Sequence, residues 1–67
     1  MTHKANGVNL GIYKLTQEYP SNTLRFYVYN GLEKEMESDH KMTNDELYNI
    51  MMDCGREWQE HRREENE

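Results

Sequence analysis

The chain has few of the residues that usually stabilise a very small domain or carry chemistry. Of its 67 residues, one is cysteine, one is proline and one is tryptophan. A single cysteine excludes an intrachain disulfide, whereas small secreted domains usually carry several. The polar start of the chain also lacks the apolar segment of a signal peptide, so we expect a cytoplasmic protein.

Long hydrophobic runs are missing as well. Hydrophobic residues make up 34% of the chain, and no run approaches the roughly 18 residues that a membrane span requires. We therefore expect no membrane partner, and the length excludes a multidomain enzyme. A domain of this size buries only about 60% of its unfolded surface. The core should be thin, with little volume for a ligand pocket of about 300 Å³.

Positive charge is scarce in the second half of the chain. Residues 1–32 contain three basic residues and one acidic residue, a formal charge of +2, whereas residues 33–67 contain five basic and twelve acidic residues, a formal charge of -7. A chain with a net charge of -5 is repelled by phosphate backbones and by anionic lipid. Direct binding of nucleic acid is therefore disfavoured, and a basic protein surface is the better electrostatic match.

Alternating apolar residues predict three strands, at about 8–17, 23–29 and 32–37, after a flexible lead-in over residues 1–7. The alternation changes phase at Gly11, which indicates either a β-bulge there or a glycine in a continuous strand that faces both sides.

The second hairpin has two candidate registers. A two-residue loop at Asn30-Gly31 would place glutamates on the buried face. A three-residue loop over residues 29–31, with Gly31 in the left-handed conformation, instead pairs Val28 with Leu32 and keeps Leu32 and Met36 on the apolar face. We therefore favour the three-residue loop.

One long helix is predicted over about residues 44–64. Thr43 and Glu46 have the spacing of a capping box, and the apolar stripe that follows has a 3.6-residue period. The stripe comprises Leu47, Ile50, Met51, Cys54, Trp58 and His61. The fold class is then α+β, a three-stranded antiparallel β-meander with the helix packed on one face and projecting beyond it. The expected sheet side of the core comprises Tyr13, Leu15, Leu24, Phe26, Val28, Leu32 and Met36.

Catalytic chemistry has little support in this sequence. Cys54 falls on the stripe that should be buried, where a thiol is inert. His3, His40 and His61 lie in different elements, and the Glu57–His61 spacing of four residues is typical of an ordinary surface pair. We expect no catalytic residue, no metal site and no cofactor.

Carboxylates follow one flank of the predicted helix. At 100° per residue this acidic flank comprises Glu46, Asp53, Glu57, Glu60 and Glu64. It is either a solvated helix face or a surface that docks on the basic groove of a larger protein. One carboxylate per about 5 Å of axis is sparser than duplex DNA, with one charge per about 1.7 Å, so the flank would be a partial nucleic-acid mimic.

Two other surfaces are candidates for binding. The uncovered sheet face should present Ile12, Lys14, Arg25, Tyr27 and Tyr29, a set that fits a protein interface, stacked nucleic-acid bases or a half-exposed face without a partner. The opposite, uncharged flank of the helix presents Tyr48, Met52 and Gly55. A glycine inside a helix costs about 1 kcal/mol, so Gly55 indicates close approach of a partner, of a second copy or of the chain's own sheet.

These features favour a small acidic, non-enzymatic protein-binding module. The leading hypothesis is a stoichiometric inhibitor or modulator of a nucleic-acid-processing protein, of viral or mobile-element origin. The alternatives are a nucleic-acid binder that uses the sheet face and a homodimeric structural subunit.

Overall fold

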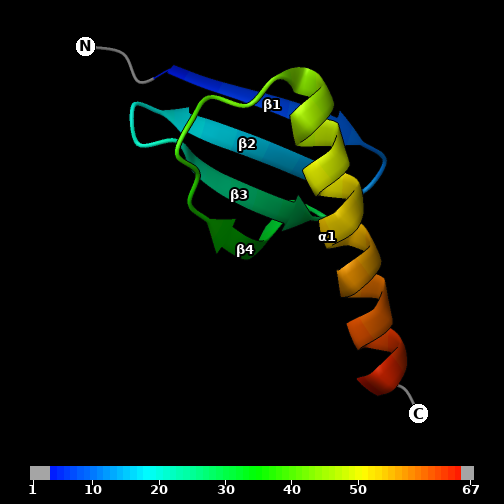
Figure 1. Cartoon of the computed structure of the whole chain (residues 1–67). Coiled ribbons are helices and arrows are strands. Elements are labelled where there is room, and N and C mark those ends of the chain that lie inside the picture. Colours follow the sequence, from blue (N-terminus) through cyan, green and yellow to red (C-terminus); the bar gives the residue numbers. More distant parts are fainter. Residues whose placement is uncertain (1–3, 66–67) are drawn as a thin grey trace.

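In the computed structural model, which describes residues 4–65, one helix covers one face of a four-stranded antiparallel sheet (Figure 1). The elements are β1 (Lys4–Leu10), β2 (Tyr13–Tyr19), β3 (Thr23–Val28), β4 (Gly31–Met36) and α1 (Asn44–Glu65). The strands lie in the order β1-β2-β3-β4, so every connection within the sheet is a hairpin. The predicted α+β class and C-terminal helix are confirmed, but the predicted number of three strands is wrong.

The additional strand comes from the start of the chain. Residues 4–7 belong to β1 and are not a lead-in, while residues 1–3 lie outside the described residues. The chain reverses at Gly11 and Ile12, and Leu10 pairs with Tyr13 across this turn. Gly11 has a φ of 62°, a conformation that glycine adopts without steric cost. The phase change in the sequence therefore marks a hairpin turn, neither a bulge nor a glycine within one continuous strand.

The β3–β4 hairpin has a shorter loop than predicted. Val28 pairs with Gly31, and the two loop residues, Tyr29 and Asn30, have φ values of 53° and 65°. Positive φ at both central residues is the requirement of a type I′ turn, whose twist matches that of the flanking strands. The predicted three-residue loop with a left-handed Gly31 is therefore wrong.

Further along the same hairpin the predicted register is correct. Leu24 pairs with Met36 and Arg25 pairs with Glu35, because a bulge opposite Phe26 and Tyr27 shifts the register by one residue. Between the bulge and the turn, Leu32 pairs with Tyr27 and is 52% exposed. Leu32 is therefore not part of the core, contrary to the prediction.

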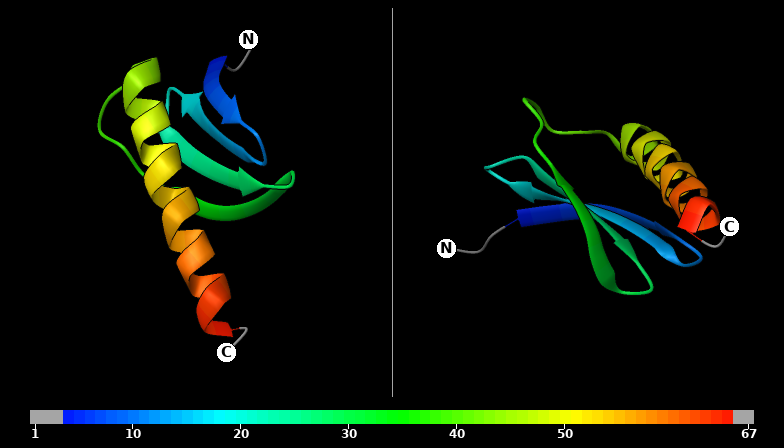
Figure 2. Two further views of the ribbon diagram at one scale, coloured as in Figure 1. Left: turned by 90° about the vertical axis from the view of Figure 1, so that its right-hand side faces the viewer. Right: turned by 90° about the horizontal axis from the view of Figure 1, so that it is seen from below.

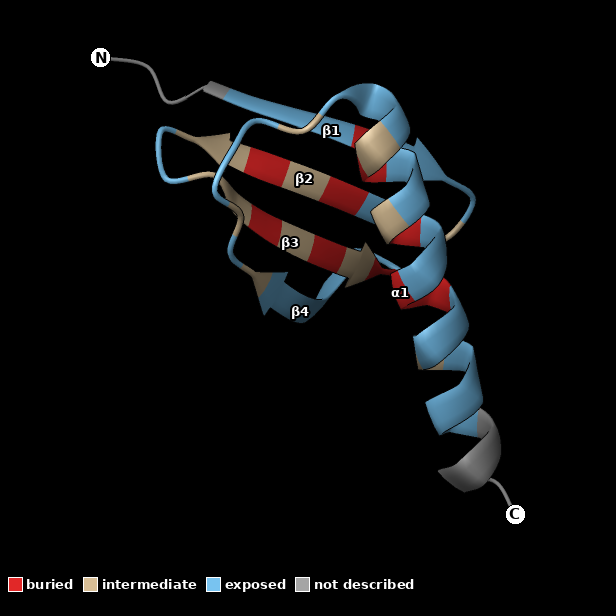
Figure 3. Ribbon diagram, in the orientation of Figure 1, coloured by how far each residue is buried: buried red, intermediate tan, exposed pale blue. Residues whose placement is uncertain are grey.

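The core lies between α1 and the face of the sheet that α1 covers. Buried and less buried residues alternate along β2 and β3, as Figure 3 shows, and the other face of the sheet is left uncovered by the helix (Figure 2). The buried apolar residues are Val8, Leu15, Leu24, Phe26, Val28, Leu47, Met51 and Cys54. Tyr13, Met36, Ile50 and Trp58 pack at its periphery, whereas His61 is exposed.

The helix begins at the predicted capping box. The backbone N–H of Glu46 donates to Thr43 Oγ1 at 3.2 Å, and the N–H of Thr43 donates to a carboxylate oxygen of Glu46 at 3.0 Å. These reciprocal bonds satisfy donors that would otherwise lack an intrahelical partner. The C-terminal turns of α1 project beyond the sheet (Figure 1), as the length of 22 residues at about 1.5 Å each predicts.

A buried glutamine fixes the connection between β4 and α1. Gln17 is fully buried on the core face of β2. Its Nε2 donates to the carbonyl oxygens of Asn22 and His40 at 3.2 and 2.9 Å, and its Oε1 accepts the N–H of Met42 at 2.7 Å. One side chain therefore holds the crossing segment against the sheet and positions the start of α1.

Replacing Gln17 should be costly although methionine has a similar shape. Gln17→Met leaves backbone groups of His40 and Met42 without partners, and each unsatisfied buried group costs about 1–3 kcal/mol. We expect the free energy of unfolding to fall by about 3 kcal/mol, measured by urea denaturation. Asn49→Leu, which removes an amide at an exposed position of α1, is the control and should change stability by less than about 0.5 kcal/mol. Equal effects of the two variants would contradict the role of Gln17.

The capping box is extended by a histidine that makes stability depend on pH. Hydrogen bonds to Asp39 at 2.8 Å and to Glu46 at 3.3 Å raise the pKa of His40 above its usual 6.5. Because the folded pKa is raised, this contribution is fully present below pH 6.5 and is lost as the pH rises through the folded value.

An NMR titration of the His40 ring should give a pKa above 6.5 in the native protein. In Asp39→Asn the value should fall towards 6.5, because the hydrogen bond to Asp39 is the largest cause of the shift. Thermal unfolding should show the native protein losing stability relative to His40→Gln as the pH rises above 6.5. An identical pH profile in the two proteins would rule out this linkage.

Candidate functional site

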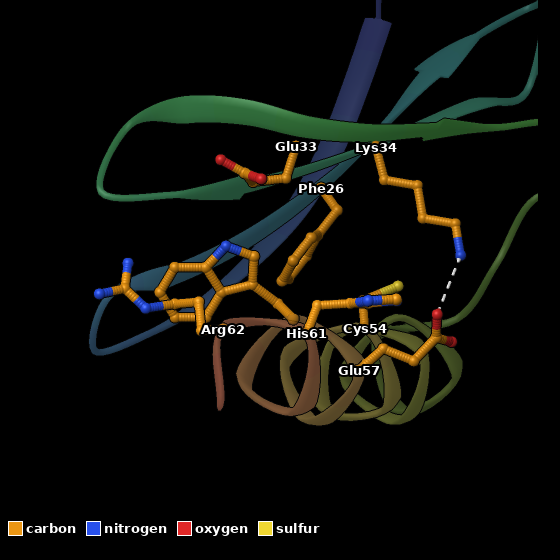
Figure 4. A pocket seen from close by; sticks show the side chains of 8 residues that line it. Phe26, Glu33, Lys34, Cys54, Glu57, His61 and Arg62 are labelled. Carbon is orange, nitrogen blue, oxygen red and sulfur yellow. Dashed lines mark ion pairs between the residues drawn. The ribbon is translucent and has the colours of Figure 1, made fainter. Parts of the chain in front are cut away.

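A groove of about 480 Å³ opens between the C-terminal half of α1 and the β3–β4 hairpin (Figure 4). It is lined by Phe26, Glu33, Lys34, Cys54, Glu57, Trp58, His61 and Arg62. The sequence predicted little room for a pocket, and that prediction is wrong because the groove does not depend on the volume of the core. It forms where α1 leaves the sheet, so its walls are the outer turns of the helix and the neighbouring strands.

Aromatic rings from three elements continue from the core to this surface. Tyr13 stacks on Phe26 with 5.9 Å between ring centroids and meets Trp58 edge-on at 6.2 Å. Tyr29, in the β3–β4 turn, meets Trp58 edge-on at 6.5 Å and is 70% exposed. The guanidinium of Arg62 lies 4.9 Å from the Trp58 ring centroid. The outer end of this aromatic cluster is thus a large apolar surface held by its own packing.

A salt bridge spans the groove from β4 to α1. Lys34 Nζ lies 3.7 Å from a carboxylate oxygen of Glu57, and Figure 4 shows the two side chains pointing towards each other. Both side chains are about half exposed, so the pair contributes roughly 0–1 kcal/mol to stability. A ligand or a partner could therefore displace this pair at little cost.

The thiol in the groove wall is not poised to react. Cys54 is 6% exposed, and burial raises the pKa of its thiol above the usual value. Lys34 acts in the opposite direction, but its effect is smaller than that of burial. A raised pKa keeps the thiol protonated near neutral pH, and the thiolate is the reactive form.

The structure divides the acidic flank into two parts. Glu46 belongs to the helix cap, and hydrogen bonds from Thr43 and His40 lower its pKa. Asp53, Glu57 and Glu60 are exposed, and Glu57 lies at the groove together with Glu33. The side chain of Glu64 lies outside the described residues. Within the flank, Glu57 therefore lines the groove, and Glu46 is the member with a structural role in the cap.

The residues predicted for the uncovered sheet face are only partly brought together. Lys14, Arg25 and Tyr27 share that face, with Lys14 Nζ 5.6 Å from the Tyr27 ring centroid. Ile12 and Tyr29 instead occupy turns, where strand alternation no longer sets their direction. The two turns touch, since the N–H of Tyr29 donates to the carbonyl of Ile12 at 3.0 Å.

The positive charge on the sheet face is largely compensated. Arg25 Nε donates to Glu35 at 2.9 Å, and a second guanidinium nitrogen donates to Glu18 at 3.3 Å. Two carboxylates therefore surround one guanidinium, which lowers the attraction of this face for phosphate.

The uncharged flank of α1 contains both exposed and buried residues. Tyr48 and Met52 are 42% and 46% exposed. Gly55 is buried under the ring of Tyr13, and a Cβ at this position would lie 3.1 Å from Tyr13 Cζ. The glycine therefore allows α1 to pack closely on the chain's own sheet. Because the Tyr13 ring covers it, Gly55 is not accessible to a partner.

The sequence did not predict the groove, the place of Lys34 and Arg62 in its wall, or the packing of Tyr13 on Trp58. The available signal was Trp58, a large apolar residue on the stripe beyond the expected end of the sheet. In residues 4–65 the structure contains no group of three His, Cys, Asp or Glu side chains arranged to hold a metal ion. No helix among those residues is long and apolar enough to cross a membrane.

Comparison of the chain with protein-family models, with curated proteins and with solved structures gave no significant match.

The burial of Cys54 in the groove wall predicts slow alkylation of its thiol. We expect Cys54 to react with iodoacetamide at pH 8 at least about tenfold more slowly than a cysteine in an unstructured peptide, because the thiol is buried and its pKa is raised. Urea above the unfolding midpoint should restore the peptide rate, as followed by mass spectrometry. Rapid alkylation of the folded protein would show that the groove exposes the thiol.

Proposed function

We propose that the protein is a non-enzymatic module that binds a larger protein through the groove and the exposed part of the acidic flank. The observation that carries this proposal is the juxtaposition of two features on the projecting half of α1. Glu57 lines the groove beside Trp58, whose ring meets that of Tyr29. Asp53 and Glu60 are exposed on the same flank of α1 as Glu57.

The charge of this surface supports a basic partner. The second half of the chain has a formal charge of -7, and a helix that projects beyond the sheet can enter a concave surface without steric conflict. Grooves that bind nucleic acid are concave and basic. The expected partner is therefore a nucleic-acid-processing protein, and the expected effect is stoichiometric competition with its nucleic acid.

The aromatic cluster supplies what the carboxylates lack. Exposed charge pairs steer encounter but add little affinity, whereas large aromatic side chains near the centre of an interface contribute most of the binding energy. Trp58 is already positioned by Tyr13 and Tyr29, so little side-chain entropy is lost when a partner covers it.

The sheet-face alternative has weaker support. Among the residues predicted for nucleic-acid contact there, Lys14 lies over Tyr27 and Arg25 is bonded to Glu18 and Glu35. A face that tracks phosphates needs accessible positive charge.

The proposal can be tested by capturing proteins on tagged native chain from nuclease-treated lysate, then titrating the captured protein's binding to a DNA duplex. We expect the native chain to displace the duplex from the captured protein. For the double variant Asp53→Asn, Glu60→Gln, the concentration of chain that displaces half of the duplex should be about tenfold higher. The control, Glu37→Gln with Asp45→Asn, makes the same charge change at exposed positions outside the acidic flank and should compete like the native chain.

A second variant separates charge from apolar anchoring. Trp58→Ala should compete less well than the native chain at every salt concentration. The charge variant should compete less well than the native chain at low salt, but the difference between the two should largely disappear at high salt, where charge interactions are screened. Equal competition by the charge variant and its control, or failure to displace the duplex, would contradict the proposal.

A further inference from the structure

The two edges of the sheet differ in a way that points to a second interaction surface. At one edge, β4 carries Glu33, Lys34 and Glu35 and is interrupted by a bulge. Charged residues and bulges are features that prevent an edge strand from pairing with another chain. The β4 edge is therefore protected against strand addition.

The β1 edge has none of these protections from Ala5 to Leu10. This segment contains no charged residue and no proline, and it pairs with β2 residue for residue without a bulge. All of its residues except Val8 are exposed. A regular, uncharged edge strand of this kind is a template for main-chain hydrogen bonds to another strand.

The direction of the backbone groups follows from the β1–β2 turn. Because that turn has two residues, Leu10 and Tyr13 form the closing hydrogen-bonded pair, and alternate residues of β1 direct their N–H and C=O towards β2. The intervening residues of β1, which are Ala5, Gly7 and Asn9, direct their backbone N–H and C=O groups away from β2. These three residues therefore offer donors and acceptors along the open edge.

An exposed apolar surface lies on the same side of the molecule. Asn6 Nδ2 donates to Asn44 Oδ1 at 2.9 Å, which places the start of α1 over β1. Tyr48 and Met52 follow Asn44 at intervals of four residues and share its side of the helix. The acidic flank faces the other way, since Glu57 reaches Lys34 of β4.

We propose that two copies of this chain pair antiparallel through β1, joining their sheets across a two-fold axis near Gly7. Leu10, Tyr48 and Met52 of each copy, which are 53%, 42% and 46% exposed, are covered at the same interface. A second copy is the occupant that the strand favours, because an antiparallel edge can pair with the same edge of another chain about a two-fold axis. Two chains of net charge -5 repel each other, but on the β1 side they meet with their acidic flanks directed away from the interface, since Glu57 reaches Lys34 of β4.

The pairing is self-complementary in register. Antiparallel pairing about Gly7 sets Ala5 opposite Asn9 of the second copy and Asn6 opposite its Val8, so side chains on the helix side meet side chains on the helix side. The interface is small, below about 1,200 Å², so we expect a dissociation constant in roughly the micromolar range. Self-association requires no partner protein, so it can be tested independently of the proposed function.

Sedimentation velocity from about 1 µM to about 1 mM brackets that range of dissociation constants. We expect the mass to rise from 8.1 kDa towards twice that value across the series. Asn9→Pro removes an outward N–H without removing a bond to β2 and should raise the dissociation constant at least about tenfold. Asn9→Ala keeps the N–H and should dimerise like the native chain.

If circular dichroism shows that the proline variant does not fold, Tyr48→Glu provides a second test of the dimer interface. It places a charge in the interface and should abolish the dimer, whereas Leu32→Glu adds the same charge at an exposed position of β4, at the opposite edge of the sheet, and should not. Hydrogen exchange at high concentration should slow at Ala5, Gly7 and Asn9. A strict monomer at about 1 mM, or a dimer insensitive to both variants, would overturn the proposal.

Discussion

The amide of Gln17 is the interaction on which the arrangement of the molecule depends. It is fully buried, and its bonds to Asn22, His40 and Met42 hold the segment that crosses from β4 to the start of α1. Buried amides are stable only when their donors and acceptors are paired. In the described part of the chain no buried side-chain donor or acceptor lacks a partner. The position of α1 over β1, β2 and β3 follows from this attachment.

With its first turn fixed over β1, α1 runs diagonally across the sheet and leaves it (Figure 1). That diagonal course separates two surfaces. On the side of β4, the helix and the hairpin enclose the groove, with Glu57 and Trp58 at its wall. On the side of β1, Tyr48 and Met52 stand above an open strand edge. The proposed partner-binding surface and the proposed self-association surface are therefore on opposite flanks of one helix and do not compete.

The stability of the fold and the proposed binding surface depend on the same few aromatic residues. Tyr13 packs on Phe26 in the core, on Gly55 in the helix and on Trp58 in the groove. A thin core is thus extended by rings that remain partly exposed, which leaves a rigid apolar surface at the edge of the domain. Gly55 permits this packing, because a larger residue there would press on the Tyr13 ring.

The sequence alone determined the elements whose signals are local. The capping box of Thr43 and Glu46, the stripe of α1 from Leu47 to Trp58 and the alternation in β3 need only neighbouring residues, and each was predicted correctly. Helical periodicity likewise grouped the carboxylates of the acidic flank, and the spacing from Thr43 assigned Glu46 to the cap as well.

Only the tertiary structure decided features that depend on residues far apart in the chain. The turn at Gly11, the bulge opposite Tyr27 and the burial of Gln17 each depend on which strand lies alongside, and alternation does not specify that neighbour. The groove arises where α1 passes the end of the sheet, so its shape depends on the length of α1 and on the angle at which α1 packs on the sheet. For the same reason Tyr29 faces Trp58 and not the open sheet face.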